Sequence, residues 1–99
     1  MAVELIITQE AERDIAEAYA WYEEQRIGLG EEFLASVDAC VLLVCRTPGI
    51  FKMVHRRCRR GSLRRFPYAL YYKLTARKLK VLGVFHASRD PKRWRMRLL

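Results

Sequence analysis

The chain has 99 residues, of which 52% are hydrophobic and 30% are charged, and its formal net charge is +8. This length suits one domain over residues 1–99, because two separate cores would each be too small to be stable. The apolar content excludes a disordered chain, and no apolar run approaches the roughly 18 residues that cross a bilayer. The first residues lack the pattern of a signal peptide. We therefore expect a globular cytoplasmic protein with no membrane partner.

Charge is divided unevenly along the sequence. Residues 1–51 hold ten acids and three arginines, a net charge of −7, whereas residues 52–99 hold sixteen lysines and arginines and a single acid, Asp90, a net charge of +15. Such a split within one domain predicts a basic face. A basic face favours an acidic partner, such as nucleic acid or an acidic protein.

The three cysteines do not form a metal-binding pattern. Cys40 and Cys45 fall in an apolar helical stretch with no histidine beside them, and Cys58 lies among arginines. A zinc site needs more ligands and closer spacing than these residues offer. We expect free thiols buried in the protein, and we expect no metal and no cofactor.

The first predicted elements are a short strand and a helix. Residues 3–7 are rich in β-branched side chains, which favours a strand. Thr8 is a good residue to begin a helix because its hydroxyl can accept from a free backbone N–H. Residues 9–25 then have helical periodicity. The glycines at residues 28–30 end this pattern in a turn.

A second helix is predicted over residues 31–46. Phe33, Val37 and Val41 form its apolar stripe, and residues 47–49, which include a proline and a glycine, end it. Two helices joined by so short a turn form an antiparallel hairpin. Their apolar faces are broad, which leaves a groove that another polypeptide could fill.

The second half changes to a period of two, which is typical of strands. The fold class that this order predicts is α+β, an N-terminal strand and a two-helix hairpin packed on a small twisted antiparallel sheet, in the order β-α-α-β-β-β-β. The strands expected after the helices are residues 50–60, 63–66, 68–74 and 79–86, with turns at 60–62 and 75–78 and a basic tail over 89–99.

Several local patterns resemble the ParE/RelE superfamily of small bacterial toxins, and the ParE-like branch in particular. They are IITQEAERDI at residues 6–15, AYAWY at 18–22, GLGEEF at 28–33, Pro48 followed by Phe51, RRFPYALYY at 64–72 and VFHASRDP at 84–91. Each pattern alone is weak, but their order and spacing together are specific. The resemblance covers residues 3–94 and implies a RelE/ParE-like fold.

The resemblance also implies a function. Resemblance to the ParE-like branch implies inhibition of DNA gyrase and a part in plasmid stabilisation, whereas resemblance to the RelE-like branch implies ribosome-dependent cleavage of mRNA. In both branches a cognate antitoxin protein wraps the toxin in a hetero-oligomer, with a helix beside the helical hairpin and an extended segment along the sheet. We expect such an antitoxin as partner, together with gyrase or, alternatively, the ribosome and mRNA.

The candidate catalytic residues suit RNA cleavage without a metal. After residue 51 only Asp90 is acidic, so a two-metal nuclease site is not expected. Metal-free cleavage needs a base, an acid and cations, which His86, Arg64, Arg65, Arg89 and Tyr71 could supply. The resemblance implies a Tyr or His-Tyr ending in active RelE-type nucleases, and this ending is absent here, so we favour a protein that is not an enzyme. Structural roles stay open as well: His86 could bond to backbone or to Asp90, and Asp90 could pair with Arg89 or cap the tail.

Two further sets are binding candidates. The density of arginines, which could also be a solvated sheet edge, and the tail tryptophan suggest a target-binding set of Arg56, Arg57, Arg59, Arg60, Arg89, Arg93 and Trp94. The aromatic and apolar stripes of the hairpin suggest an antitoxin-binding set of Tyr19, Trp21, Tyr22, Phe33, Val37 and Val41. Three hypotheses remain: a gyrase inhibitor, a ribosome-dependent endonuclease, and a non-toxic basic module that binds nucleic acid.

Overall fold

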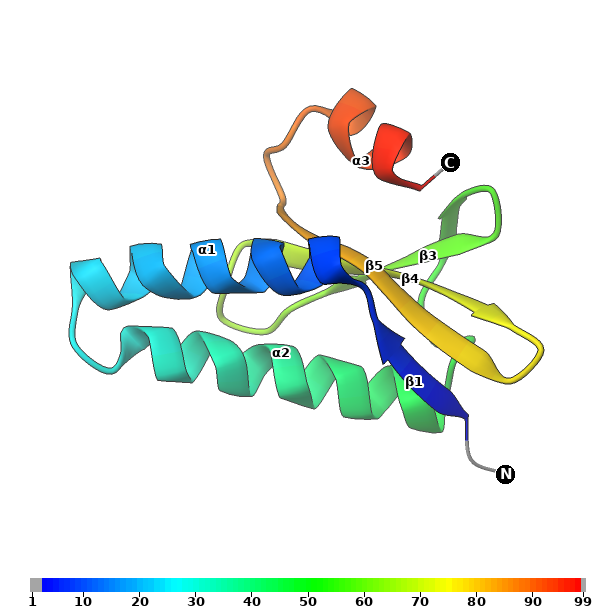
Figure 1. Cartoon of the computed structure of the whole chain (residues 1–99), viewed down its shortest axis with the longest axis horizontal. Coiled ribbons are helices and arrows are strands. Elements are labelled where there is room, and N and C mark those ends of the chain that lie inside the picture. Colours follow the sequence, from blue (N-terminus) through cyan, green and yellow to red (C-terminus); the bar gives the residue numbers. More distant parts are fainter. Residues whose placement is uncertain (1–2, 99) are drawn as a thin grey trace.

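The computed structural model describes residues 3–98. Figure 1 shows two long helices lying side by side as an antiparallel hairpin next to a twisted sheet, and a short third helix beyond the last strand. The strand, the two helices and the later strands follow in the predicted order. The elements are β1 (Glu4–Ile7), α1 (Gln9–Gln25), α2 (Leu29–Arg46), β2 (Met53–His55), β3 (Cys58–Ser62), β4 (Tyr68–Thr75), β5 (Lys78–His86) and α3 (Pro91–Arg97).

Thr8 begins α1 as predicted. Its Oγ1 accepts a hydrogen bond from the backbone N–H of Ala11 at 3.1 Å, which satisfies one of the free donors of the first turn. The inward face of the helix carries Ala18 and Tyr22, both buried. Thr8 also donates its N–H to the carbonyl of Val81, so the cap joins the helix to the sheet.

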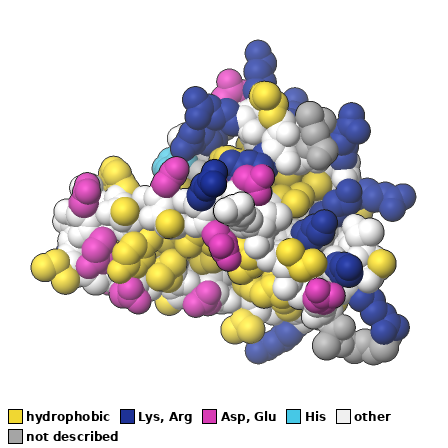
Figure 2. Space-filling model, viewed as in Figure 1, with side chains coloured by type: hydrophobic (Ala, Val, Ile, Leu, Met, Phe, Trp, Pro, Cys, Tyr) yellow, Lys and Arg dark blue, Asp and Glu magenta, His cyan; other side chains and the backbone are white. Residues whose placement is uncertain are grey.

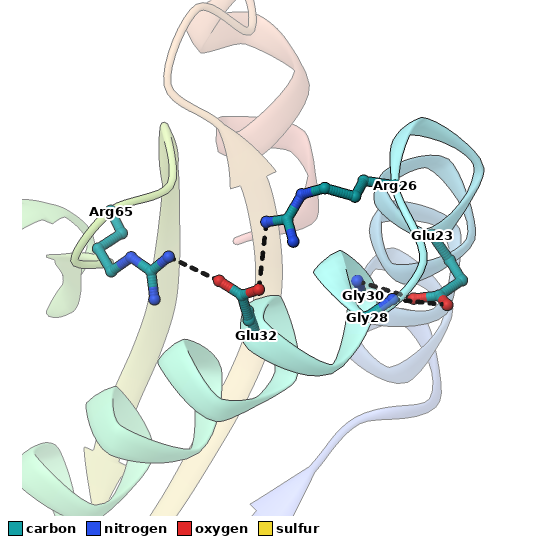
Figure 3. Close-up of polar contacts among 6 residues, drawn as sticks. All are labelled: Glu23, Arg26, Gly28, Gly30, Glu32 and Arg65. Atoms are coloured by element: carbon teal, nitrogen blue, oxygen red, sulfur yellow. Dashed lines mark hydrogen bonds and ion pairs between the residues drawn. The ribbon is translucent and has the colours of Figure 1, made fainter.

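The turn between α1 and α2 is held by the carboxylate of Glu23. One oxygen accepts from the N–H of Gly28 and the other from the N–H of Gly30, both at 3.0 Å (Figure 3). Gly28 has a φ of +91°, which side-chain-bearing residues rarely adopt. A Cβ on Gly30 would lie 2.8 Å from the Tyr19 ring. Glycine at position 30 therefore lets the two helices approach closely.

The sheet is mixed, with the strand order β1-β5-β4-β3-β2. All neighbouring strands are antiparallel except β1 and β5, which pair in parallel from Glu4 opposite Lys78 to Ile7 opposite Val81. The pattern of the strands predicts an antiparallel sheet throughout, and the parallel pair corrects this prediction. Side-chain alternation is the same in parallel and antiparallel pairs, so the pattern of β1 could not indicate its direction.

The boundaries after α2 differ most from expectation. The predicted strand over residues 50–60 is two strands joined by a tight turn, in which Arg56 and Arg57 have φ of 46° and 68°. The predicted turn at 60–62 lies inside β3, and residues 63–66 form a loop rather than a strand. Gly61 lies within β3, and a Cβ at this position would lie 2.7 Å from the Phe51 ring. Glycine here allows a close approach rather than a turn.

The two faces of the sheet are covered by different helices. The alternation predicted for β4 is confirmed: Leu70 and Tyr72 pack in the core beneath α1 and α2, while Ala69 and Tyr71 pack in a second cluster with residues of α3. The predicted basic tail is the helix α3, and Asp90 caps it by accepting from the Lys92 N–H at 2.9 Å. Within residues 3–98, no helix is both long enough and apolar enough to span a bilayer.

The cysteines are free thiols, as predicted. Cys40 and Cys58 are buried and Cys45 is half-buried. Burial raises the pKa of the Cys40 thiol to about 11. Such a thiol stays protonated at neutral pH and is a poor nucleophile. Groups of three or more potential metal ligands are absent from the part of the chain that the structure describes.

Candidate functional site

A cleft of about 800 Å³ opens between α1, the end of β5 and α3. One wall is acidic, with Glu10, Asp14 and Glu17 on α1. The opposite wall is basic, and the floor is formed by apolar and aromatic side chains. The basic wall and the floor comprise Arg89, Arg93 and Arg97, and Ala18, Trp21, Tyr68, Val84, Phe85, His86 and Met96. The cleft therefore offers both signs of charge around an aromatic base.

Asp14 joins the three elements that form this cleft. Its Oδ2 accepts from the backbone N–H of Val84 at 3.0 Å and from Arg97 Nη1 at 2.8 Å, and its Oδ1 accepts from Arg97 Nη2 at 3.3 Å. Strand β1 pairs with β5 only up to Val81, so Val84 has no strand neighbour on that side among residues 3–98. The carboxylate takes the place of the missing strand and holds α3 through Arg97.

His86 lies at the end of β5 and lines the cleft with Arg89 and Arg93. Its Nδ1 accepts from the Ser88 N–H at 3.1 Å and lies 2.8 Å from the Ser88 hydroxyl. A backbone N–H can only donate, so in the neutral ring the proton is on Nε2. The ring packs edge-on against Tyr68, with centroids 5.2 Å apart. This arrangement confirms the predicted strand-end histidine that bonds to backbone.

Tyr68 is the other titratable group on the cleft floor. Burial raises its pKa above the ordinary value, the charge of Arg89 lowers it, and the charge of Glu17 raises it further. The hydroxyl therefore stays protonated at neutral pH. It can donate a hydrogen bond to a group in the cleft, but it does not act as a base there.

The residues predicted for RNA cleavage are not gathered in one place. His86 and Arg89 line the cleft, but Tyr71 is 1% exposed on the other face of the sheet, stacked at 5.2 Å under Trp94. Burial raises the pKa of Tyr71. Arg65 forms an ion pair at 2.6 Å with Glu32 of α2 (Figure 3), and Arg64 is exposed on the same loop. The set is therefore divided among three places.

The predicted target-binding residues also occupy separate positions. Arg56 and Arg57 are exposed at the tip of the β2–β3 hairpin, and Arg89 and Arg93 line the cleft. Arg59 donates to the Phe51 carbonyl at 2.6 Å, which is a structural contact. The two remaining residues are half-buried and both lie against the Tyr71 ring, Arg60 from β3 and Trp94 from α3.

Four of the six predicted antitoxin-binding residues are buried in this chain's own core. Tyr22, Phe33, Val37 and Val41 have exposed fractions between 0% and 9%. They form the inner stripe of the hairpin, which packs on the sheet, so a partner does not reach them in this structure. The apolar periodicity located the buried face correctly, but the sheet already covers it. Trp21, which is 55% exposed, and the half-buried Tyr19 reach the surface.

The outer surface of the hairpin carries a second, shallower groove of about 460 Å³. Figure 2 shows apolar side chains gathered between the two helices, with acidic side chains around them. The Tyr19 hydroxyl donates to Glu31 at 2.9 Å across this groove. Its lining is Ile7, Ile15, Ala16, Tyr19 and Leu34, with Glu12 and Glu31 at the rim. Leu34 is not among the predicted antitoxin-binding residues, although its position at the margin of the apolar stripe of α2 is a signal for a place in this groove.

The polar contacts of the hairpin extend to the sheet. Glu32 accepts from Arg26 of the interhelical turn at 3.2 Å and from Arg65 of the loop before β4 at 2.6 Å (Figure 3). Its hydrogen bond with Arg65 lowers the pKa of Glu32 most, and the bond with Arg26 lowers it further. Both arginines are more than half exposed, so each pair contributes little stability.

Solved structures with the same fold are toxins of toxin–antitoxin systems. The isolated Escherichia coli RelE toxin superposes with a TM-score of 0.67 at 20% identity, over 99% of this chain and 100% of that one. A chromosomal ParDE system of Pseudomonas aeruginosa gives 0.64 at 18% identity, over 86% and 96%. The RelBE2 complex of Mycobacterium tuberculosis gives 0.61 at 20% identity, over 87% and 99%. At these identities the likeness establishes the fold.

Family membership comes from the sequence itself. No curated protein matched the chain. The family model described as the ParE toxin of the type II toxin–antitoxin system parDE matches residues 5–91. That match includes the hairpin, the sheet and most of the cleft residues. Because it spans most of the chain, the protein belongs to the ParE toxin family of type II toxin–antitoxin systems.

Proposed function

We propose that this toxin acts in the cytoplasm by binding DNA gyrase, and that a cognate antitoxin protein neutralises it in a hetero-oligomer. The observation that supports binding rather than catalysis is the separation of the predicted nuclease groups. His86 and Arg89 lie in the cleft, whereas Tyr71 is buried under α3. A protein that inhibits by binding does not need these groups in one site.

The antitoxin would bind two surfaces that the chain leaves open. The outer hairpin groove offers Ile15, Tyr19 and Leu34 as apolar contacts. The cleft adds Trp21, which is 55% exposed beside the end of β5. Apolar contacts of this kind supply most of the affinity of a partner helix, and the charged rims supply rate and orientation.

The test of gyrase binding is a supercoiling assay with purified chain and purified gyrase. We expect inhibition that rises with the amount of toxin and is lost when the co-encoded antitoxin is added first. Full gyrase activity at a large molar excess of folded toxin would remove gyrase as the target. The variant Arg89→Gln/Arg93→Gln would show whether the basic wall of the cleft takes part.

A second candidate function is a RelE-like ribosome-dependent mRNA endonuclease. The observation in its favour is that His86, Arg89 and Arg93 line the same cleft, with the His86 Nε2 proton available for donation. Primer extension on ribosome-bound message, with and without the chain, tests it. New 3′ ends that disappear with His86→Ala would support cleavage, and their absence with wild-type chain would dismiss it. In the third alternative, a non-toxic basic module, the chain binds nucleic acid and leaves growth unaffected.

A further inference from the structure

We propose that the tips of the β2–β3 and β4–β5 hairpins form one surface that binds the phosphate backbone of nucleic acid without regard to sequence. The surface, called the hairpin-tip surface below, consists of Arg56, Arg57, Lys73, Arg77, Lys78 and Lys80. It is separate from the α1–β5–α3 cleft and from the groove on the outer surface of the α1–α2 helical hairpin. The proposal stands whether gyrase or the ribosome is the toxin's target.

The strand register brings the two tips to the same end of the sheet. Strand β3 runs antiparallel to β4 with Arg59 opposite Tyr72, so the start of β3 lies beside Lys73. Strand β4 ends at Thr75 opposite Lys78. The turn at Arg56 and Arg57 therefore adjoins the turn that follows Thr75. Figure 2 shows dark blue side chains over α3 and along the sheet end of the molecule, whereas the acidic side chains lie mostly over the helical hairpin.

Like charges face each other within this surface. Lys73 and Lys80 are direct cross-strand partners, and like charges in that position destabilise a sheet. Lys78 lies on the same face, opposite Thr75. The ion pairs among residues 3–98 are Arg26–Glu32, Arg65–Glu32 and Arg97–Asp14, and none of them involves the hairpin-tip surface. A polyanion would relieve this repulsion.

Acidic residues that could compete for these cations are scarce. From residue 52 to residue 89 the sequence contains no acid. Glu4 of β1 is a nearby carboxylate, paired in register with Lys78 at the edge of the sheet. One carboxylate beside six basic side chains leaves a strong positive field at this end of the molecule.

The residues at the two turns adopt positive φ values, which residues with side chains disfavour. Arg56 and Arg57 have φ of 46° and 68°, and Ala76 and Arg77 have φ of 46° and 66°. Turns with two positive φ values favour Asn-Gly, because other side chains are strained there. Three arginines at such positions keep cationic side chains at the tips at the expense of stability. This is the pattern expected when the side chain has a use in binding.

The chemistry of the surface favours nucleic acid over a membrane or an acidic protein. Cations dominate this surface, and the exposed apolar side chains on the same strands are Leu74 of β4 and Met53 and Val54 of β2, too few to enter a lipid interface deeply or to form the dry centre of a protein interface. The two tips belong to four neighbouring strands, which span about 14 Å. Duplex DNA presents about eight phosphates over that length when both of its strands are counted. Six cations therefore suffice to contact a short stretch of the backbone.

The test compares two double variants with the same change in net charge. Arg57→Gly/Arg77→Gly removes two tip cations at positions that favour glycine, and Arg13→Gln/Arg26→Gln removes two cations from the helical hairpin. Binding of a short random-sequence DNA duplex is followed by fluorescence anisotropy over a series of NaCl concentrations. The logarithm of the affinity falls with the logarithm of the salt concentration, with a slope of about 1 per phosphate contact.

We expect the tip variant to reduce the salt slope by about 2 and to weaken binding to all duplex sequences equally. The control variant of the helical hairpin, Arg13→Gln/Arg26→Gln, should bind as the wild type does. Lys73→Gln/Lys80→Gln serves as an independent tip variant and should behave like the first. Circular dichroism melts confirm that each variant is folded.

Three results would overturn the proposal. The first is a tip variant with unchanged affinity and slope. The second is an equal loss in Arg13→Gln/Arg26→Gln, which would mean that net charge alone drives binding. The third is binding to vesicles of phosphatidylserine and phosphatidylcholine with no binding to DNA at the same salt concentration. None of these results bears on gyrase inhibition, which is measured separately.

Discussion

Asp14 and Arg97 are 83 positions apart in the sequence and form an ion pair of 2.8 Å between Oδ2 and Nη1. The same carboxylate oxygen accepts from the backbone of Val84. The Arg97 guanidinium also lies over the Phe85 ring, with its carbon 4.8 Å from the ring centroid. This contact fixes α3 against the sheet and so sets the width of the cleft between α1 and α3.

Replacing Asp14 should destabilise the protein. The change Asp14→Ala removes the acceptor of the Val84 N–H and leaves the half-buried Arg97 with the Leu82 carbonyl as its remaining acceptor, so we expect a loss of about 1–3 kcal/mol in the free energy of unfolding. For a domain of this size, that corresponds to a fall in Tm of several degrees. Thermal melts followed by circular dichroism measure it. Glu10→Ala, on the same face of α1, is the control, and an equal fall there would contradict the role given to Asp14.

Replacing Gly30 should destabilise the protein, because the side chains of Tyr19 and Glu23 would have to move. In Gly30→Ala the new Cβ would lie 2.8 Å from the Tyr19 ring and 2.9 Å from the Glu23 carboxylate that holds the turn. Forced displacement of packed groups costs about 1–3 kcal/mol. Gly49→Ala is the matched control, since nothing lies within 4 Å of its Cβ position. Denaturant titration of both variants should separate them, and equal stability would refute the packing described for Gly30.

Arg57→Gly should make the protein more stable. Arg57 has a φ of 68° in a two-residue turn, a conformation that strains any side-chain-bearing residue by about 1–2 kcal/mol. Glycine has a larger conformational entropy in the unfolded chain, which offsets part of the relieved strain. The expected net gain in the free energy of unfolding is therefore about 1 kcal/mol. Urea unfolding measures the gain. A comparison with Arg60→Gly, inside β3, should give a loss instead, and a loss at both positions would argue against the turn.

Stability should fall at alkaline pH through Cys40. Burial raises the pKa of this thiol to about 11, above its unfolded value near 9. A group whose pKa is raised in the folded state holds its proton more tightly there. Its contribution is complete below pH 9 and is lost as the pH rises towards 11. Unfolding measured across this range should show the decline, and Cys40→Ala should reduce the pH dependence.

The fold could be predicted where the evidence is local. The Thr8 cap, the two helices and the alternation of Leu70 and Tyr72 against Ala69 and Tyr71 follow from short-range patterns that the structure confirms. The parallel pairing of β1 with β5 could not be predicted, because it joins segments more than 70 residues apart. Asp90-Pro91 carries a signal for α3, an N-cap followed by proline, but the pair is also compatible with a capped irregular tail.

The candidate site was harder to predict than the fold. Periodicity identifies which face of a helix is buried, but not whether this chain or a partner covers it. The pattern therefore predicts antitoxin contacts for Phe33 and Val37, which the sheet of this chain covers. The composition shows that the second half is basic, but it does not show which arginines are free to bind a target. It therefore does not separate Arg59, which bonds to the Phe51 carbonyl, from the exposed Arg57. Asp14 has no local pattern that would have identified its contacts across 70 and 83 positions.

We propose gyrase as the target of this ParE-family toxin, and supercoiling in living cells tests that proposal. The most direct measurement is the superhelical density of a reporter plasmid in growing bacteria after the chain is induced without its antitoxin, with protein synthesis followed in the same cultures. The account predicts that the plasmid loses negative supercoiling while protein synthesis continues, and that co-expressed antitoxin prevents the change. Arrest of protein synthesis with plasmid topology unchanged would contradict it and would indicate the ribosome as the target.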